Sequence, residues 1–314
     1  MSAPTASKSG VVCLDKPTGM TSFRAVSAVR HALGFAKAGH CGTLDPMATG
    51  VLPIALGEAT KLVQFLVDHD KSYRATVRLG QATDTQDADG AFTDARPWEH
   101  VTEDALLAAA AGFVGVTRQK VPMYSAVRVD GERLHARARR GEVVDTPERD
   151  VHITAVRITR VALPDFEVEL DCGRGTYVRA FAVALAQALG TAGHLIALRR
   201  TRVGVLTEAN ALTLDALRER AAQGGSVPLL DLRDALGGAL PEFAIDAEEA
   251  AFLWRSGHLP YVARDRALAL GPTERLALIS PAGLAAVARV TDVVSMLRVM
   301  VPEAVTHAAI DTPP

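Results

Sequence analysis

The chain has 314 residues, of which 48% are hydrophobic and 22% are charged. This balance excludes an intrinsically disordered chain, and the length allows one large domain plus a small one without disulfide or metal support. No uninterrupted apolar stretch reaches the roughly 18 residues of a membrane span. The formal net charge of −2 gives no overall attraction for nucleic acid, so any phosphate-binding surface has to be local.

The three cysteines, Cys13, Cys41 and Cys172, are odd in number and far apart. They argue against a disulfide framework and favour a cytoplasmic protein. No cysteine or histidine pair has the spacing of zinc ligands, so we expect no metal. Residues 1–10 are small and polar and lack the apolar core of a secretory signal, which predicts a flexible tail.

The first half of the chain mixes short apolar runs with helical segments. Apolar or alternating patterns predict the strands, while capping residues and periodicity predict the helices. The expected order is a strand at 11–14, a helix at 22–33, an ordered loop at 38–49, a strand at 51–56, a helix at 58–67, a strand at 73–79, a helix at 103–112 and a strand at 123–129.

The second half continues the irregular mixture. We expect a short basic helix at 134–140, an antiparallel strand pair at 153–161 and 166–172, a helix at 177–189, an extended segment at 195–205 and helices at 214–222 and 229–235. Such mixing indicates an α+β fold with a mainly antiparallel mixed sheet flanked by helices. Glycine and proline at 237–241 place a boundary between a domain at 11–237 and a smaller one at 238–302, which has one helix and several short strands. Residues 303–314 are expected to be a second flexible tail.

Asp45 precedes Pro46 in a loop, residues 38–49, that is rich in glycine and threonine. An aspartate in such a setting is most often a turn former whose carboxylate caps backbone N–H groups. The loop also carries His40 and stands between two apolar elements, and loops anchored on both sides are common places for catalysis. The sequence thus leaves a structural and a catalytic interpretation open.

Arg179 lies in the first turn of the helix expected at 177–189. The helix dipole favours anions there, so an arginine in this position tends to need a carboxylate partner. A local surface arginine is the alternative. Further along, Leu198 stands beside Arg199 and Arg200, which indicates a strand with one apolar and one basic face.

The segment 128–140 concentrates positive charge, although the whole chain is almost neutral. Its arginines are Arg128, Arg133, Arg137, Arg139 and Arg140. Such a cluster can form one positive face for phosphates, and a solvated helix face is the plain alternative.

Six motifs, in order, closely resemble those of bacterial TruB-type pseudouridine synthases. They are Asp15–Ser22, Ala38–Leu52, Lys71–Ala75, Val121–Ala126 followed by Gly131, Gly173–Arg179, and Leu198–Thr201. The resemblance implies a pseudouridine-synthase fold with a small PUA-like C-terminal domain. It further implies isomerisation of the T-loop uridine conventionally numbered 55 in tRNA, with no cofactor, and an accompanying role in tRNA folding.

The resemblance also assigns roles in the site. Asp45 matches the nucleophile, which attacks C6 of the base or assists glycal formation at the ribose; the sequence does not choose. Arg179 matches the arginine that holds that carboxylate ionised, because a nearby opposite charge lowers the pKa of an acid. The remaining matches are Tyr73, which stacks on the extruded uracil and moves a proton, Leu198 and Tyr177, which line the pocket, and His40, which fills the gap left by the flipped base. A loop histidine satisfied by the backbone is the alternative for His40.

Residues 128–150 match a thumb-like insertion that closes over RNA. Its five arginines, together with Arg199 and Arg200, are expected to contact phosphates. The expected partner is the T arm of tRNA, and we expect no membrane, no obligatory protein partner and a monomer. Three alternatives remain: a guide-RNA-dependent synthase of the archaeal and eukaryotic branch, a purely RNA-binding or RNA-folding module, and a hydrolase with an aspartate nucleophile.

Overall fold

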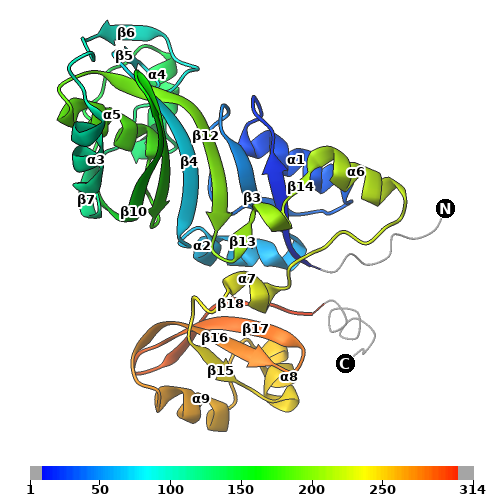
Figure 1. Ribbon diagram of the computed structural model, residues 1–314. Helices are drawn as coiled ribbons and strands as arrows, with labels where there is room; N and C mark the ends of the chain where they lie inside the picture. The colour runs from blue at the N-terminus through cyan, green and yellow to red at the C-terminus, as the bar shows by residue number, and fades with distance from the viewer. Residues whose placement is uncertain (1–8, 303–314) are drawn as a thin grey trace.

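A ten-stranded mixed sheet forms the centre of the larger part of the molecule in the computed structural model, which describes residues 9–302 (Figure 1). Its path is β14-β1-β3-β12-β4-β11-β10-β7, with β2 paired to β3 and β13 to β12. The strands are β1 (Gly10–Lys16), β2 (Ala38–His40), β3 (Thr49–Leu56), β4 (Lys71–Leu79), β7 (Gly115–Lys120), β10 (Glu148–Ala162), β11 (Asp165–Cys172), β12 (Gly193–Val203), β13 (Leu206–Thr207) and β14 (Leu212–Thr213). Within this ten-stranded sheet only β1 with β14 and β3 with β12 pair in parallel, so the expected mainly antiparallel α+β fold is confirmed.

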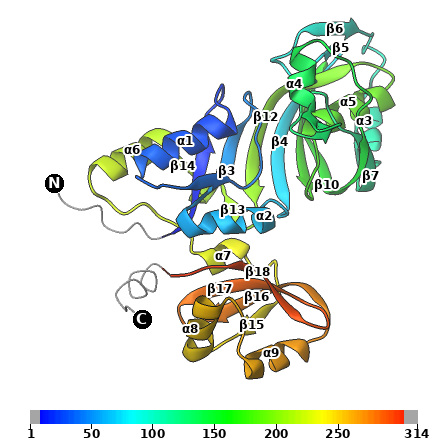
Figure 2. The same cartoon turned by 180° about the vertical axis from the view of Figure 1, so that it is seen from behind.

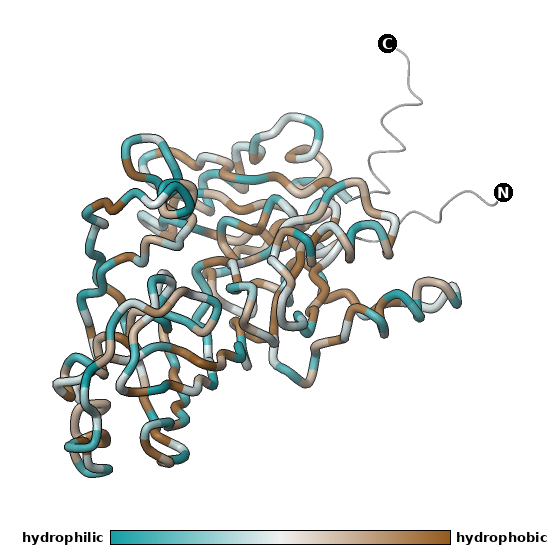
Figure 3. Tube along the Cα trace, turned by 90° about the horizontal axis from the view of Figure 1, so that it is seen from above, coloured by the Kyte–Doolittle hydropathy of each residue, from teal (hydrophilic) through white to brown (hydrophobic). Residues whose placement is uncertain are grey.

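Helices cover both faces of this sheet (Figure 2). The helices are α1 (Ser22–Ala32), α2 (Val63–Leu66), α3 (Glu103–Ala111), α4 (Leu134–Arg139), α5 (Val178–Ala188), α6 (Leu214–Ala222) and α7 (Leu232–Leu236). Alternate residues of β1 enter different cores: Val12 and Leu14 belong to the core that includes α1, α3, α5 and α6, whereas Val11 and Cys13 belong to one that includes α2, α7 and part of the C-terminal sheet. This is the two-residue period of a strand buried on both faces. Figure 3 shows hydrophobic, brown segments in the middle of the larger part of the molecule.

A second, four-stranded sheet forms the C-terminal domain. Its order is β15 (Glu242–Ala244), β16 (Thr273–Ser280), β17 (Gly283–Val290) and β18 (Val294–Val299), and α8 (Ala247–Ser256) and α9 (Tyr261–Leu268) pack on it. The sequence predicted one helix here and missed α9, because only its small residues Ala263 and Ala267 are buried. Arg275 of β16 joins the two domains through an ion pair of 2.7 Å with Asp68.

Several local predictions differ from the structure. The strand expected at 123–129 is limited to β8 (Arg128–Val129), which pairs with β9 (Glu132–Arg133). The helix expected at 58–67 begins as a 3-10 helix, η1 (Gly57–Leu62), before α2. The loop expected at 38–49 starts with the short strand β2, and a hairpin of β5 (Gln81–Thr83) and β6 (Phe92–Ala95) was not foreseen.

The remaining expectations concern the ends and the insertion. Residues 1–8 and the tail expected at 303–314 lie outside the described residues, and Gly10 already belongs to β1. The excursion between β7 and β10 covers residues 121–147, and the Val121 N–H closes it by donating to the Pro147 carbonyl at 3.0 Å. Within residues 9–302, no helix is both long and apolar enough to cross a membrane.

Candidate active site

The loop between β2 and β3, residues 41–48, carries Asp45 and is held from behind by Arg200. The Arg200 side chain is fully buried. Its Nε donates to the Val51 carbonyl at 2.7 Å, and its two terminal nitrogens donate to the Thr43 and Gly42 carbonyls at 3.2 Å each. One guanidinium therefore fixes the backbone just before Asp45 and the strand just after the loop.

Lys16 holds the other side of Asp45. Its side chain is fully buried, and its Nζ donates to the carbonyls of Pro17 at 2.8 Å, Met20 at 2.7 Å and Pro46 at 3.2 Å. Burial lowers the pKa of Lys16 to about 8, although the charge of Asp45 opposes the shift. The three N–H bonds of the charged amine thus match three carbonyls, one of them next to Asp45.

A buried serine completes the support of the loop. Ser22 donates its hydroxyl to the Leu44 carbonyl at 2.9 Å and accepts from the Leu44 N–H at 2.8 Å. Thr18 donates to the Met47 carbonyl at 3.0 Å. Sequence reasoning included these residues in a motif but gave them no role, although a lysine closing an apolar strand was a usable signal.

Asp45 forms the expected ion pair with Arg179, which extends from the first turn of α5. Arg179 Nε donates to Asp45 Oδ2 at 2.9 Å and Nη2 donates to Oδ1 at 3.2 Å, a two-pronged contact. The Arg179 side chain is only 4% exposed, whereas that of Asp45 is 28% exposed. The buried arginine therefore orients the Asp45 carboxylate, and part of that carboxylate stays accessible to solvent.

Arg179 is itself anchored by two further segments. Its Nη1 donates to the Thr85 carbonyl at 2.7 Å and its Nη2 to the Tyr124 carbonyl at 2.9 Å. A second carboxylate, Asp87, lies 3.6 Å from Nε and is 5% exposed. Burial raises the pKa of Asp87, while Thr85 and Arg179 oppose the shift. The sequence placed Asp87 in an ordinary acidic turn, and no local pattern distinguishes it from one.

Tyr73 and Leu198 lie on the same face of neighbouring strands. Tyr73 of β4 is opposite Arg200 of β12, and Leu198 is opposite Ala75, one same-face pair further along. Both side chains belong to the core that also contains Leu44. Burial raises the pKa of the Tyr73 phenol to about 12, with the Arg200 charge opposing, so the phenol is neutral at physiological pH.

Tyr177 and His40 are the two remaining residues that the sequence assigned to the site. Tyr177 precedes α5, its N–H donates to the Gln119 side chain at 3.0 Å, and the Arg149 guanidinium lies 5.3 Å from its ring centroid. His40 ends β2, and its buried Nδ1 has no hydrogen-bond partner within the described part of the chain. Burial, and then the charge of Arg200, lower the pKa of His40, which favours a neutral ring.

Two of the five arginines of the 121–147 segment form ion pairs within it. Arg140 pairs with Glu132 and Glu142, and Arg137 pairs with Glu142 at 2.9 Å and with Asp130 at 3.6 Å. The exceptions are Arg128, which donates to the Gly131 carbonyl, and Arg133 and Arg139, which are exposed and form no ion pair within residues 9–302.

One of the two arginines of β12 differs from the expectation of phosphate contacts. Arg200 is buried behind the 41–48 loop, so its guanidinium is not available to a phosphate; the prediction is wrong because its charge is used on backbone carbonyls. Arg199 is paired with Asp15 at 3.0 Å and with Glu208. In the described part of the chain, no group of three or more His, Cys, Asp or Glu side chains is arranged to hold a metal ion.

Sequence comparisons identify the family. The model of the TruB family pseudouridylate synthase N-terminal domain matches residues 30–178, and that of the tRNA pseudouridylate synthase B C-terminal domain matches residues 179–235. A tRNA pseudouridine synthase B of Aromatoleum aromaticum is 48% identical over 78% of this chain and 79% of its own. One of Caulobacter sp. (strain K31) is also 48% identical, over 77% and 78%. The chain belongs to the TruB family of pseudouridylate synthases.

Solved structures extend the likeness in fold to the C-terminal domain of this TruB-family chain. A chain in a Cbf5-Nop10-Gar1 complex superposes with a TM-score of 0.70 at 24% identity and covers 94% of this chain and 86% of its own. A chain from an H/ACA RNP bound to a substrate RNA containing 2′-deoxyuridine gives 0.69 at 23% identity and covers 93% and 85%. The family models end at residue 235, so the likeness of the sheet β15 to β18 to known proteins rests on these solved structures.

Proposed function

We propose that this chain converts the T-loop uridine conventionally numbered 55 in tRNA to pseudouridine, with Asp45 as the nucleophile. The observation that carries the proposal is the partly exposed Asp45 carboxylate, held by two hydrogen bonds from buried Arg179. The relatives that are 48% identical are named tRNA pseudouridine synthase B, which supports tRNA as the substrate class.

The reaction rearranges one nucleotide without adding atoms to it. The bond between C1′ and N1 breaks, the uracil turns, and a bond between C1′ and C5 forms, after which C5 loses its proton and N1 carries one. Asp45 supplies an electron pair transiently, either to C6 of the base or in forming a glycal at the ribose. Tyr73, with a neutral phenol, stacks on the base and relays the C5 proton beside Leu198.

The target base has to leave the T-loop stack, at a cost of about a few kcal/mol. We assign His40 to the gap, since a neutral ring can stack there without burying a charge. Tyr177 forms a further wall of the pocket. The segment 121–147 closes over the RNA, with exposed Arg133 and Arg139 as its first phosphate contacts. Arg128, Arg137 and Arg140 follow by exchanging protein partners for phosphates.

The wider assignment follows from the same site. We place the catalytic domain at 11–237 and a PUA-like domain at 238–302. Each has a core of its own, and a further core that includes Val11, Leu236 and Val287 joins the two. The three buried, free cysteines support a cytoplasmic enzyme. We propose that it acts as a monomer on the T arm without a protein partner, and that base flipping also helps tRNA to refold.

A guide-RNA-dependent synthase is the second candidate, because the similar solved structures come from an H/ACA RNP and a Cbf5 complex. Their identity to this chain is 23% to 24%, half that of the bacterial tRNA enzymes. Turnover of tRNA by the purified chain alone separates the two, since a guide-dependent enzyme requires added RNA.

Proton release from C5-labelled uridine in unmodified tRNA tests the proposal. We expect stoichiometric release by the wild type and none by Asp45→Ala, which still binds tRNA. The exposed helix residue Asp104 provides the matched control Asp104→Ala, with normal release. Proton release by Asp45→Ala would contradict the assignment of Asp45 as the nucleophile. Undiminished proton release from tRNA with cytidine at position 55 would contradict the assignment of that position as the target.

A further inference from the structure

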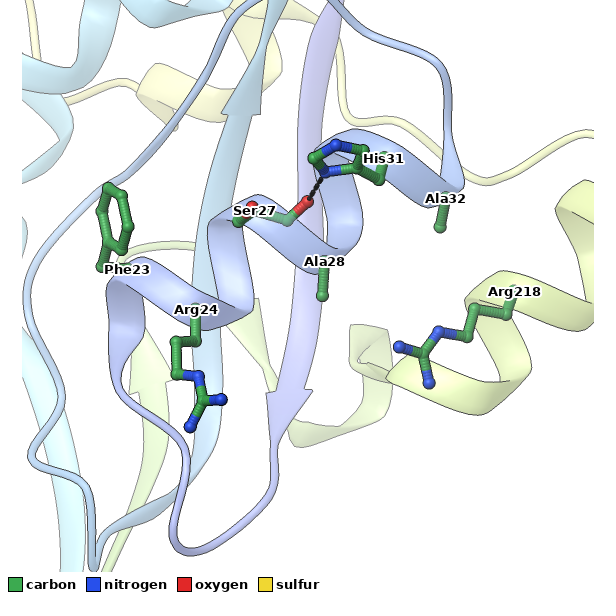
Figure 4. Close-up of a pocket in the computed structure, with 7 residues that line it drawn as sticks. All are labelled: Phe23, Arg24, Ser27, Ala28, His31, Ala32 and Arg218. Carbon is green, nitrogen blue, oxygen red and sulfur yellow. Dashed lines mark hydrogen bonds between the residues drawn. The ribbon is translucent and has the colours of Figure 1, made fainter.

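A groove between α1 and α6 lies outside the site described above. Its volume is about 550 Å³, and its lining residues are Phe23, Arg24, Ser27, Ala28, His31, Ala32 and Arg218. Figure 4 shows Arg24, Ala28 and Ala32 along one side of α1, with Arg218 reaching across from α6. The lining contains two arginines and a histidine but no carboxylate, in a protein with a net charge of −2.

Phe23 is the most unusual member of this groove. Its side chain is 77% exposed, although it stands in the first turn of a helix whose opposite face is buried. Arg24, beside it, has no side-chain hydrogen bond or ion pair within the residues that the structure describes. Arg218, the second arginine, pairs with the exposed carboxylate of Asp215 at 3.2 Å, a contact that a phosphate can replace. An exposed aromatic ring beside two exposed guanidinium groups, over a floor of alanine and serine, is the combination that binds single-stranded nucleic acid, because bases stack on the ring and phosphates meet the cations.

The groove is rigidly connected to the catalytic loop. Ser22, the residue before Phe23, exchanges two hydrogen bonds with Leu44, the residue before Asp45. Figures 1 and 2 both place α1 and α6 at one end of the sheet and α4 at the other, with β3, β12 and β4 between them. A stem-loop held between Asp45 and the 121–147 segment therefore leaves the groove on the far side of the target nucleotide.

We propose that the groove between α1 and α6 binds nucleotides of the substrate RNA that lie outside the stem-loop carrying the target uridine. One base stacks on Phe23, and the adjoining phosphates contact Arg24 and Arg218. The inference rests on the proposed function, since it extends the RNA path from that site. An acidic protein surface would satisfy the cations as well, but nothing in that chemistry uses the exposed ring next to the catalytic loop.

Binding of two RNAs tests the groove: full-length unmodified tRNA and the isolated T stem-loop. We expect Phe23→Ala to raise the Kd for tRNA about tenfold. Arg24→Gln is expected to lower the slope of log K against log salt by about 1. Neither change should alter the Kd for the stem-loop. Arg220→Gln is the matched control, because Arg220 is exposed on α6 but does not line the groove, and it should bind both RNAs like the wild type.

The outcomes separate this inference from the proposed function. Wild-type protein that releases no proton from either RNA would defeat the proposed function. If the wild type turns over tRNA but Phe23→Ala and Arg24→Gln bind tRNA unchanged, the RNA-binding role of the groove is wrong and the proposed function stands. An acidic protein would then be the remaining partner for the groove. An equal loss on both RNAs would also overturn the proposal, by placing the groove within the stem-loop contact. Both side chains are exposed, and equal melting temperatures exclude misfolding.

Discussion

The 41–48 loop and the 121–147 segment both reach the ion pair of Asp45 with Arg179 but are held in opposite ways. The loop is fixed by buried donors: Arg200, Lys16 and Ser22 bind its carbonyls from inside the core. The segment has backbone hydrogen bonds of its own, such as that from the Leu134 N–H to the Val127 carbonyl, but its arginines form exposed ion pairs, such as Arg140 with Glu132. The two meet at Arg179, which binds Asp45 and the Tyr124 carbonyl.

This difference separates positioning from capture. Exposed ion pairs contribute about 0–1 kcal/mol each and exchange partners readily, so the segment can trade carboxylates for phosphates. Buried donors cannot be exchanged, because each carbonyl left unpaired in the interior costs about 1–3 kcal/mol. The loop is therefore organised before RNA arrives, whereas the segment can adapt to it. The following changes act on one region and leave the other as the reference.

Arg200→Met should have the largest effect. It leaves three carbonyls without their donor, those of Gly42, Thr43 and Val51. We expect the free energy of unfolding to fall by about 3 kcal/mol, and turnover to fall with it, because the loop loses its support. Chemical denaturation measures the first and proton release the second.

Arg139→Met is the matched control for this change, because Arg139 is an exposed arginine of α4 without an ion pair in the described chain. Its free energy of unfolding should stay within about 0.5 kcal/mol of the wild type. Equal stabilities of the two variants would show that Arg200 does not support the loop.

Arg179→Lys should keep the fold and lose activity. A single ammonium cannot span both Asp45 oxygens and also reach the Thr85 and Tyr124 carbonyls. We expect the single-turnover rate at saturating tRNA to fall about a hundredfold, the effect of a small misplacement of a reacting group. The Kd for tRNA should change little, and a near-normal rate would count against the ion pair as the positioning device.

How far the sequence predicts this site depends on the kind of contact. The contact between Asp45 and Arg179 was predictable, since motif resemblance and the poor fit of an arginine at a helix start indicated the same pair. The sheet was predictable too, because alternation in β4 marks one buried face. The segment 121–147 was not, as its turns are held by side chains rather than by periodic pairing.

The missed residues share a physical reason. Arg200 was assigned to phosphates because it is charged, and Asp87 to a turn because acids surround it. Their burial depends on strands and loops that meet only in the folded chain: Gly50 approaches the Arg200 carbonyl so closely that a Cβ would lie 2.2 Å from it. The local sequence does not indicate such a contact. Charge was then the only guide, and it predicted that both side chains lie on the surface.

Lys16 predicts an alkaline limit to activity. Its pKa is lowered to about 8 by burial, and the neutral amine has two N–H bonds for three carbonyls. We expect turnover to fall about fivefold as pH rises through about 8, the effect of one lost hydrogen bond of about 1 kcal/mol. Lys16→Met should be slow at every pH and lack this limb in the rate profile.

The lowered pKa of Lys16 also distinguishes a local loss of activity at high pH from unfolding of the protein. Because the folded-state pKa of Lys16 lies below its ordinary value of 10.5, the unfolded chain binds more protons between those values. This group alone therefore makes the free energy of unfolding rise with pH there. Lys71 is the matched control: its pKa is also lowered to about 8, but it donates to only two carbonyls, so Lys71→Met should retain the limb. Loss of the limb in that variant would transfer the assignment to Lys71.

The smallest effects are expected in the 121–147 segment, and they should depend on salt. Arg139→Gln removes a cation that forms no ion pair in the described chain, so the slope of log K against log salt for tRNA should fall by about 1. Arg140→Gln also frees Glu132, whose negative charge then faces the phosphates, while Glu142 keeps its ion pair with Arg137. Its Kd should therefore rise several-fold more than that of Arg139→Gln at low salt, with no change in the saturated rate. A lower saturated rate for Arg140→Gln would mean that the segment positions Asp45 through Tyr124 and Arg179, and that capture and positioning are not separate.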